Sequence, residues 1–276
     1  MLKSCSPSCK PTALDLWIQT CCNSGYVIKK MPVLRPSLWV ILLFLAACAP
    51  TRDVMRSPEA EKSALWSPCT RAQALMWEQE AKQQPDAAFQ AARCYAVLAR
   101  NGKTRAMRLE NAAKGRTWAE TAISKAPEDG TAHYLAAYLA GLEAENDTLR
   151  GLALVPVIER GALAAARLNP ELDHGGPDRM LGELYLRAPG PPVSIGDLEK
   201  ALVHYKRAIV QDPDFFENRL GLAEAYLEDE EPGPACDQLR KVLTCMPPCN
   251  GRELPWKRAL DLMKRLCEMK TQTQDN

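Results

Sequence analysis

Apolar and small residues recur at intervals of three and four positions through most of the chain, with polar residues between them. This period is typical of amphipathic helices, and no stretch alternates with a period of two over the length of a strand. The pattern therefore predicts an all-α protein of about ten antiparallel helices. We expect these helices near residues 71–83, 86–100, 104–126, 131–146, 150–168, 177–187, 196–211, 215–229, 233–245 and 253–270.

Several expected helix boundaries carry their own signals. Asp129-Gly130 and Asp214 are expected to open helices, because a short polar side chain accepts hydrogen bonds from the free N–H groups of a first turn. Pro85-Asp86 is expected to break the first helical hairpin, since proline has no N–H to donate.

The same residue types return at the offsets of a tetratricopeptide repeat (TPR), a 34-residue pair of helices A and B. One unit has Leu222, Ala223 and Tyr226 in helix A, Ala235, Leu239 and Val242 in helix B, and Pro247 at its end. The unit before it has Leu181, Gly182, Tyr185, Ala201, Tyr205, Ala208 and Pro213, with seven extra residues inserted within residues 188–197. Small residues let paired helices approach and proline stops helix B, so the repeats predict a TPR-like α-solenoid with a concave face.

A short apolar run over residues 38–45 follows Arg35 and ends in Leu45-Ala46-Ala47-Cys48. A basic segment, an apolar segment and small residues before a cysteine are typical of a bacterial lipoprotein signal. The run is too short for a membrane span, which needs roughly 20 apolar residues. We therefore expect Cys48 to be lipidated, although an apolar core strand that ends in cysteine is the alternative.

The position of this signal defines the expected domains. Signals begin close to the start of a chain, so Met31 is the expected first residue, and residues 1–30 are interpreted as a gene-model extension or a disordered leader. The signal peptide is then 31–47. Residues 48–70 form a lipidated linker, 71–270 the TPR-like helical domain and 271–276 a disordered tail. Because Ala49 rather than aspartate follows the cysteine, we expect an outer-membrane protein that faces the periplasm.

Charge gives no indication of a nucleic-acid partner. Without residues 1–47 the chain has 30 Lys and Arg against 33 Asp and Glu, a net charge of −3 over 229 residues. A nucleic-acid-binding domain is usually basic. The near-neutral balance therefore excludes this class from the hypotheses and leaves the lipid as the expected membrane contact.

Six cysteines follow Cys48, an even number that suggests disulfides in an oxidising compartment. Cys236 and Cys267 lie almost symmetrically about the turn at residues 247–251 and are expected to join two antiparallel helices. Cys245 and Cys249 then remain for a local bridge, and Cys69 and Cys94 for the first helical hairpin. Free thiols and a Cys₄ zinc site are the alternatives, but the last four cysteines lack the paired spacing typical of zinc sites.

Residues 168–185 read LNPELDHGGPDRMLGELY, and the proline-rich insertion after them ends in Ser194-Ile195-Gly196-Asp197. Together these segments resemble the T-component family of lipoproteins associated with tripartite ATP-independent periplasmic (TRAP) transporters. The resemblance covers about residues 86–246. It implies a TPR-like fold, a periplasm-facing lipoprotein, association with a solute-binding protein that delivers small organic ligands, and a channel through the T component.

Candidate binding residues cluster around the irregular Gly175-Gly176-Pro177 turn, because glycine permits a close approach of the backbone to a ligand. His174 beside it either points into a ligand cavity or caps a helix. Arg179 either clamps a ligand carboxylate through two hydrogen bonds or forms an ordinary salt bridge. His133 and Tyr134 with Tyr138 either line the concave face or make inter-repeat contacts. Tyr185 completes the candidate ligand- or partner-binding set.

No nucleophile–base pair, phosphate-binding loop or metal-binding motif appears, so we expect no catalytic residue, metal or cofactor. The leading hypothesis is a non-enzymatic, periplasm-facing lipoprotein that binds a periplasmic solute receptor in TRAP-type transport and holds a small apolar or organic-acid ligand. The alternative is a general cell-envelope TPR scaffold that captures a peptide or helix of an assembly or secretion partner. We expect Arg179 and residues 190–194 to contribute to partner or ligand binding and little to stability, whereas binding that survives changes at both would favour the general scaffold.

Overall fold

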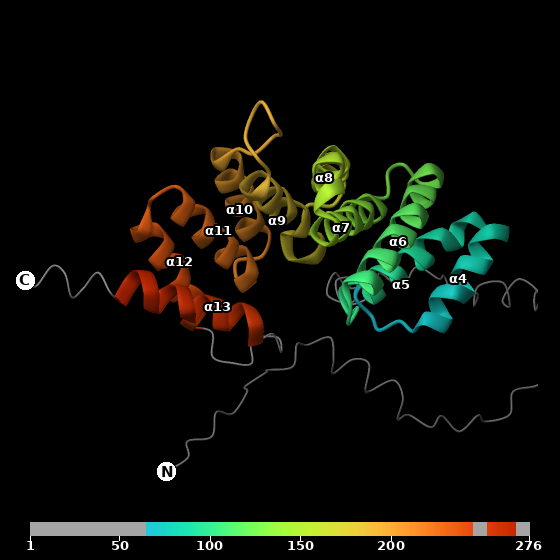
Figure 1. Cartoon of the computed structure of the whole chain (residues 1–276), viewed down its shortest axis with the longest axis horizontal. Helices are drawn as coiled ribbons and strands as arrows, with labels where there is room; N and C mark the ends of the chain where they lie inside the picture. Colours follow the sequence, from blue (N-terminus) through green and yellow to red (C-terminus); the bar gives the residue numbers. More distant parts are fainter. Residues whose placement is uncertain (1–64, 245–252, 269–276) are drawn as a thin grey trace, which may run out of the picture. The chain divides into compact units, whose positions relative to one another are not determined.

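The computed structural model describes residues 65–244 and 253–268. The chain divides into units Met1–Met55 and Arg56–Asn276, of which the first lies outside the described residues. The described residues form ten α-helices, which follow one another as neighbours in Figure 1. These are α4 (Arg71–Gln83), α5 (Ala88–Arg100), α6 (Arg105–Lys125), α7 (Gly130–Asn146), α8 (Thr148–Leu168), α9 (Leu172–Arg187), α10 (Leu198–Gln211), α11 (Phe216–Glu228), α12 (Pro232–Thr244) and α13 (Glu253–Met263).

The predicted all-α class is confirmed, and each expected helix has a counterpart within a few residues. Pro85 and Asp86 begin a short 3₁₀ turn, η2 (Pro85–Ala87), between α4 and α5, as expected of a helix breaker. The predicted cap of α11 is wrong. Phe215, not Asp214, occupies the cap position and makes no side-chain cap bond. The Asp212 carboxylate instead accepts a hydrogen bond from the backbone N–H of Asp214, within the turn that precedes α11.

Consecutive helices pack against each other from α4 to α13. Every second helix also touches: α5 contacts α7, α7 contacts α9, α9 contacts α11 and α11 contacts α13. This alternation is the arrangement of paired helices in a TPR-like array. Small residues make it close. A Cβ atom on Gly221 would collide with the Tyr205 ring, so this aromatic ring fits between α10 and α11 only because position 221 has no side chain. Tyr205 is one of the residues that the repeat pattern singled out.

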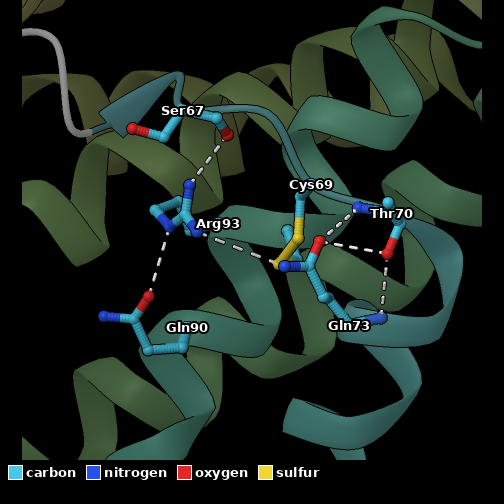
Figure 2. Close-up of a disulfide and its surroundings, with 7 residues drawn as sticks. Ser67, Cys69, Thr70, Gln73, Gln90 and Arg93 are labelled. Carbon is cyan, nitrogen blue, oxygen red and sulfur yellow. Dashed lines mark hydrogen bonds between the residues drawn. A yellow bond between two sulfur atoms is a disulfide. The ribbon is translucent and has the colours of Figure 1, made fainter.

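Two predicted disulfides are present. Cys69, just before α4, joins Cys94 of α5, with their Cα atoms 5.3 Å apart (Figure 2). Cys236 of α12 joins Cys267 of the π-helical turn η3 (Lys264–Glu268), with a Cα–Cα distance of 5.9 Å. Cys48, Cys245 and Cys249 lie outside the described residues, as do the signal, the leader and the tail.

The described residues can be judged for membrane-spanning helices and for metal-binding clusters. None of their helices combines the length and apolarity needed to cross a membrane. Within the same residues, no group of three or more His, Cys, Asp and Glu side chains has the arrangement of a metal site.

The Cys236–Cys267 bond is predicted to stabilise the C-terminal helices. Replacement of both cysteines by serine should lower the free energy of unfolding by about 3 kcal/mol, because the unfolded chain regains the freedom that the cross-link removes. Urea denaturation of the oxidised protein measures this change. Equal stability of the Cys236→Ser/Cys267→Ser variant and the parent would contradict the prediction.

Candidate functional site

A cavity of about 680 Å³ opens on α7 and α9, with further walls from α5, α8, α11 and the residues before α4. Its walls combine aromatic, aliphatic and charged side chains, a composition typical of ligand or partner sites. The lining residues are Trp66, Arg100, Tyr134, Ala137, Tyr138, Gly141, Leu142, Ala144, Glu145, Ile158, Asp173, Gly176, Arg179, Met180, Glu183, Leu184, Arg187 and Glu217.

A buried carboxylate, Asp173, lies in the cavity wall and accepts hydrogen bonds from three side chains. Tyr134 Oη donates to Oδ2 over 2.6 Å, Arg179 Nη2 donates to the same oxygen over 2.8 Å, and Trp66 Nε1 donates to Oδ1 over 2.8 Å. The donors come from α7, α9 and the segment before α4. A buried charge is costly unless it is paired and hydrogen-bonded. Asp173 therefore holds three separate parts of the chain at one point.

The start of α9 has an unusual backbone. Asp173, His174 and Gly175 have φ angles of 48°, 62° and 76°, in the left-handed region that non-glycine residues seldom adopt. Arg179 stabilises this turn, because its Nη1 donates to the carbonyl oxygens of Asp173 and His174. Asn218 of α11, which is fully buried, donates to the His174 carbonyl over 2.9 Å. The structure thus begins α9 at Leu172, through a kink, and not at residue 177.

Several groups of the protein itself contact the Arg179 guanidinium. Besides Asp173 and the turn, its Nη1 donates to Asn218 Oδ1 over 3.0 Å, and its guanidinium lies 4.8 Å from the centre of the Phe215 ring. Burial by itself lowers the pKa of Arg179, but the groups around it, with the Asp173 carboxylate foremost, together outweigh burial and raise the pKa. Of the two interpretations of Arg179, the salt bridge is the one observed, and the carboxylate it clamps is Asp173.

Three other predicted residues, Tyr134, Tyr138 and Gly176, reach the cavity with Arg179. The Tyr134 ring is buried, and its phenol has a pKa raised by burial and by the Asp173 charge, so it remains a donor. Gly176 is required for this contact, because a Cβ atom there would lie 2.6 Å from Tyr134 Oη. The close approach that the sequence predicted at Gly176 thus involves a tyrosine of the chain.

The remaining predicted site residues do not line the cavity. His174 pairs with Asp212 at 2.6 Å and stacks on Phe215, so it neither points into the cavity nor caps a helix. The other four make packing or hydrogen-bond contacts elsewhere: Gly175 lies against Ala208, Pro177 is fully buried, Tyr185 donates to Glu159, and His133 bonds to the Pro127 carbonyl. The insertion at residues 188–197 contributes no residue to the cavity wall.

Trp66 is the main site residue that sequence reasoning missed. It belongs to the segment assigned to the linker, yet its ring lies 4.8 Å from the Tyr138 ring and Arg100 lies 5.0 Å from its centre. The apolar pair Leu65-Trp66 shortly before Cys69 was the available signal, because a cysteine bonded to the domain holds its neighbours close. Arg100 and Met180 carried no local signal.

Comparison with known proteins gives the repeat type. The TPR repeat family matches residues 193–229, which contain α10 and α11. A solved structure of TTC0263, a thermophilic TPR protein in Thermus thermophilus, is similar at 21% identity and a TM-score of 0.49, over 68% of this chain and 88% of that one. No curated protein matches the chain. The chain therefore contains a TPR repeat within a TPR-like helical array, and no comparison points to a TRAP-associated family.

The sequence led us to expect that Arg179 contributes little to stability, but its contacts predict a substantial contribution to the free energy of unfolding. Its side chain is 17% exposed and that of Asp173 10%, so Arg179→Ala should lower the free energy of unfolding by about 3 kcal/mol by leaving a buried carboxylate without its cation. Arg240→Ala is the matched control, because the Arg240 and Asp237 side chains are 60% and 63% exposed and should contribute less than about 1 kcal/mol. Equal unfolding free energies for the two variants in urea would refute the structural role of Arg179.

Proposed function

We propose that the protein is a non-enzymatic TPR-type scaffold that binds a partner protein at the cavity on α7 and α9. The main support for this proposal is the cavity, which has a volume of about 680 Å³. The helices that surround it are held in place by the packing of the repeats. Rigid walls favour affinity because little conformational freedom is lost when a partner binds. Helical repeat proteins characteristically bind partners along such surfaces.

The cavity wall suits an apolar group with an anionic end. Tyr138, Met180 and Leu184 provide apolar surface. Arg100 is held over the Trp66 ring, and among residues 65–244 and 253–268 no hydrogen-bond acceptor or carboxylate contacts its guanidinium. An arginine with free donors is a good partner for a carboxylate. This chemistry supports a protein side chain or a small apolar or organic-acid ligand as the occupant.

Two other charged groups of the wall, Asp173 and Arg187, have structural roles. Asp173 already accepts three hydrogen bonds, and Arg187 donates to Glu183 and Glu224, each over 2.9 Å. Catalysis needs a group that is free to exchange protons or attack a substrate. Pairing of this kind supports a structural and not a catalytic role for Asp173 and Arg187.

The proposal includes a lipid anchor and a periplasmic partner. The Leu45–Cys48 cleavage pattern supports lipidation of Cys48, and the resemblance of residues 168–185 and 194–197 supports a TRAP-type solute receptor as the partner. The second candidate is a cell-envelope scaffold for an assembly or secretion protein. It draws support from the TPR match, since this repeat commonly captures peptides or helices.

The lipid anchor has a direct test. Cys48→Ser should abolish incorporation of radiolabelled palmitate and leave the protein uncleaved or released from the membrane, because Cys48 is the proposed acceptor. Cys69→Ser, which removes another cysteine of the same chain, should still incorporate the label. Palmitate in the Cys48→Ser protein would overturn the proposed anchor.

The partner site is tested by cross-linking and pull-down from the envelope. Met180→Glu places a charge in the cavity wall and should lower recovery of the partner at least about ten-fold, because an unpaired charge would face an apolar surface. Met107→Glu is the matched control, since Met107 is 44% exposed on α6 and does not line the cavity. Recovery of a TRAP-type solute receptor supports the first candidate, and recovery of an assembly or secretion protein supports the second.

A shortened insertion separates the cavity from the other predicted site. Deletion of residues 190–194 should leave binding unchanged, since they lie outside the cavity wall. Loss of the partner in this deletion, together with full binding by Met180→Glu, would move the site to the insertion and overturn the proposal. Thermal melts of all variants serve as the control that each variant is folded when its binding is measured.

A further inference from the structure

Residues 65–70, here called the strap, lie against the cavity although they belong to no repeat. Leu65 is 4% exposed and packs in one apolar cluster with Tyr134 and Leu135 of α7. The Trp66 ring forms part of the cavity wall between Tyr138 and Arg100. A segment that precedes the helical array therefore occupies one side of the proposed binding site.

The strap is fastened at several points. Ser67 accepts a hydrogen bond from Arg93 Nη1 at its carbonyl oxygen over 3.0 Å, and Cys69 is bonded to Cys94 (Figure 2). Thr70 then begins α4 with a capping box shared with Gln73. Only two residues separate Trp66 from the disulfide. Such a short tether keeps the indole at a high effective concentration beside the cavity.

Release of Trp66 would leave the charge of Asp173 paired, although its Oδ1 would lose the Trp66 hydrogen bond. Asp173 loses one neutral donor but keeps Arg179 and Tyr134, so no buried charge is left without a partner. The hydrogen bond that Asp173 Oδ1 loses must be restored by a donor on the incoming side chain, because a buried acceptor without a donor is costly. The Trp66 side chain is also only half-buried, unlike Tyr134. Arg100 would lose its ring contact and become available to an incoming carboxylate.

We infer that the strap is an intramolecular ligand of the cavity, locked by the Cys69–Cys94 disulfide, and that an extended partner segment carrying an aromatic side chain displaces Trp66. This inference rests on the proposed partner site and specifies the partner. The displacing side chain packs on Tyr138 and donates a hydrogen bond to Asp173, as Trp66 does. Tryptophan and tyrosine meet both requirements, because each combines an apolar ring with a donor. The strap lowers the apparent affinity for the partner by the fraction of time that it fills the site.

The test uses a fluorescent peptide of residues 63–70 with C69S, added to the full-length oxidised protein. The peptide should bind the Trp66→Ala variant at least about ten-fold more tightly than the parent, because the variant leaves the indole subsite empty. Trp77→Ala is the matched control, since Trp77 is also partly buried but does not line the cavity, and its affinity should equal that of the parent. Equal affinity of Trp66→Ala and the parent, or no binding to either, would overturn the inference.

A second pair of variants tests the lock and keeps Trp66 in place. Cys69→Ser/Cys94→Ser should bind the peptide more tightly than the parent, at least about three-fold, whereas Cys236→Ser/Cys267→Ser should match the parent. An unchanged affinity in the first variant would show that the disulfide does not hold the strap, and would overturn the lock. These outcomes concern the strap alone, because the proposed function depends on the Met180→Glu pull-down with the natural partner.

Discussion

The hydrogen-bonded Asp173 carboxylate is the interaction on which the cavity depends. Its three donors, Trp66, Tyr134 and Arg179, come from positions far apart in the sequence. A charge in a largely apolar environment must be compensated where it lies, so the three donors converge on Asp173. The strap, α7 and the left-handed turn of α9 meet at this carboxylate, and the cavity is the space that their meeting leaves open.

Repeat packing provides the frame around this polar centre. In a helical array each helix contacts mainly its neighbours, so within residues 65–244 and 253–268 the end helices α4 and α13 have a consecutive helix on one side only. The two disulfides of the described chain lie at these ends, one beside α4 and one beside α13. Each cross-link limits fraying where packing is least. At the N-terminal end the same bond also keeps Trp66 beside the cavity, which joins end protection to control of the binding site.

The helices could be predicted from the sequence because their signals are local. The helical period of the apolar residues, together with the small residues and prolines, predicted ten helices. The nearly symmetric positions of Cys236 and Cys267 about one turn predicted their disulfide. The site was predicted only in part. Gly176, Arg179 and Tyr134 were found because the Gly175-Gly176-Pro177 turn interrupts the repeat and aromatic residues four apart share a helix face. The groups that these residues contact could not be predicted. Asp173 and Trp66 are 107 positions apart in the sequence, and no local pattern indicates that they form a hydrogen bond.

His174 illustrates the same limit from the other side. A histidine next to two glycines is typical of a ligand site. The His174 side chain instead pairs with Asp212, between α10 and α11, and stacks on Phe215. Which way a side chain turns depends on a backbone conformation that is itself stabilised by Arg179 and Asn218. Burial of Asp173 could likewise not be inferred, because an aspartate before a glycine pair is usually a solvated turn residue.

Hydrogen exchange in Asp173→Asn tests most directly whether one carboxylate holds the cavity together. Asparagine tolerates the left-handed backbone, so the substitution removes the charge and leaves the conformation of the turn accessible. If Asp173 is the common anchor, amide exchange should accelerate together in residues 65–70, in the first half of α7 and in residues 172–180. Faster exchange confined to residues 172–176, with the strap and α7 as protected as in the parent, would contradict this account.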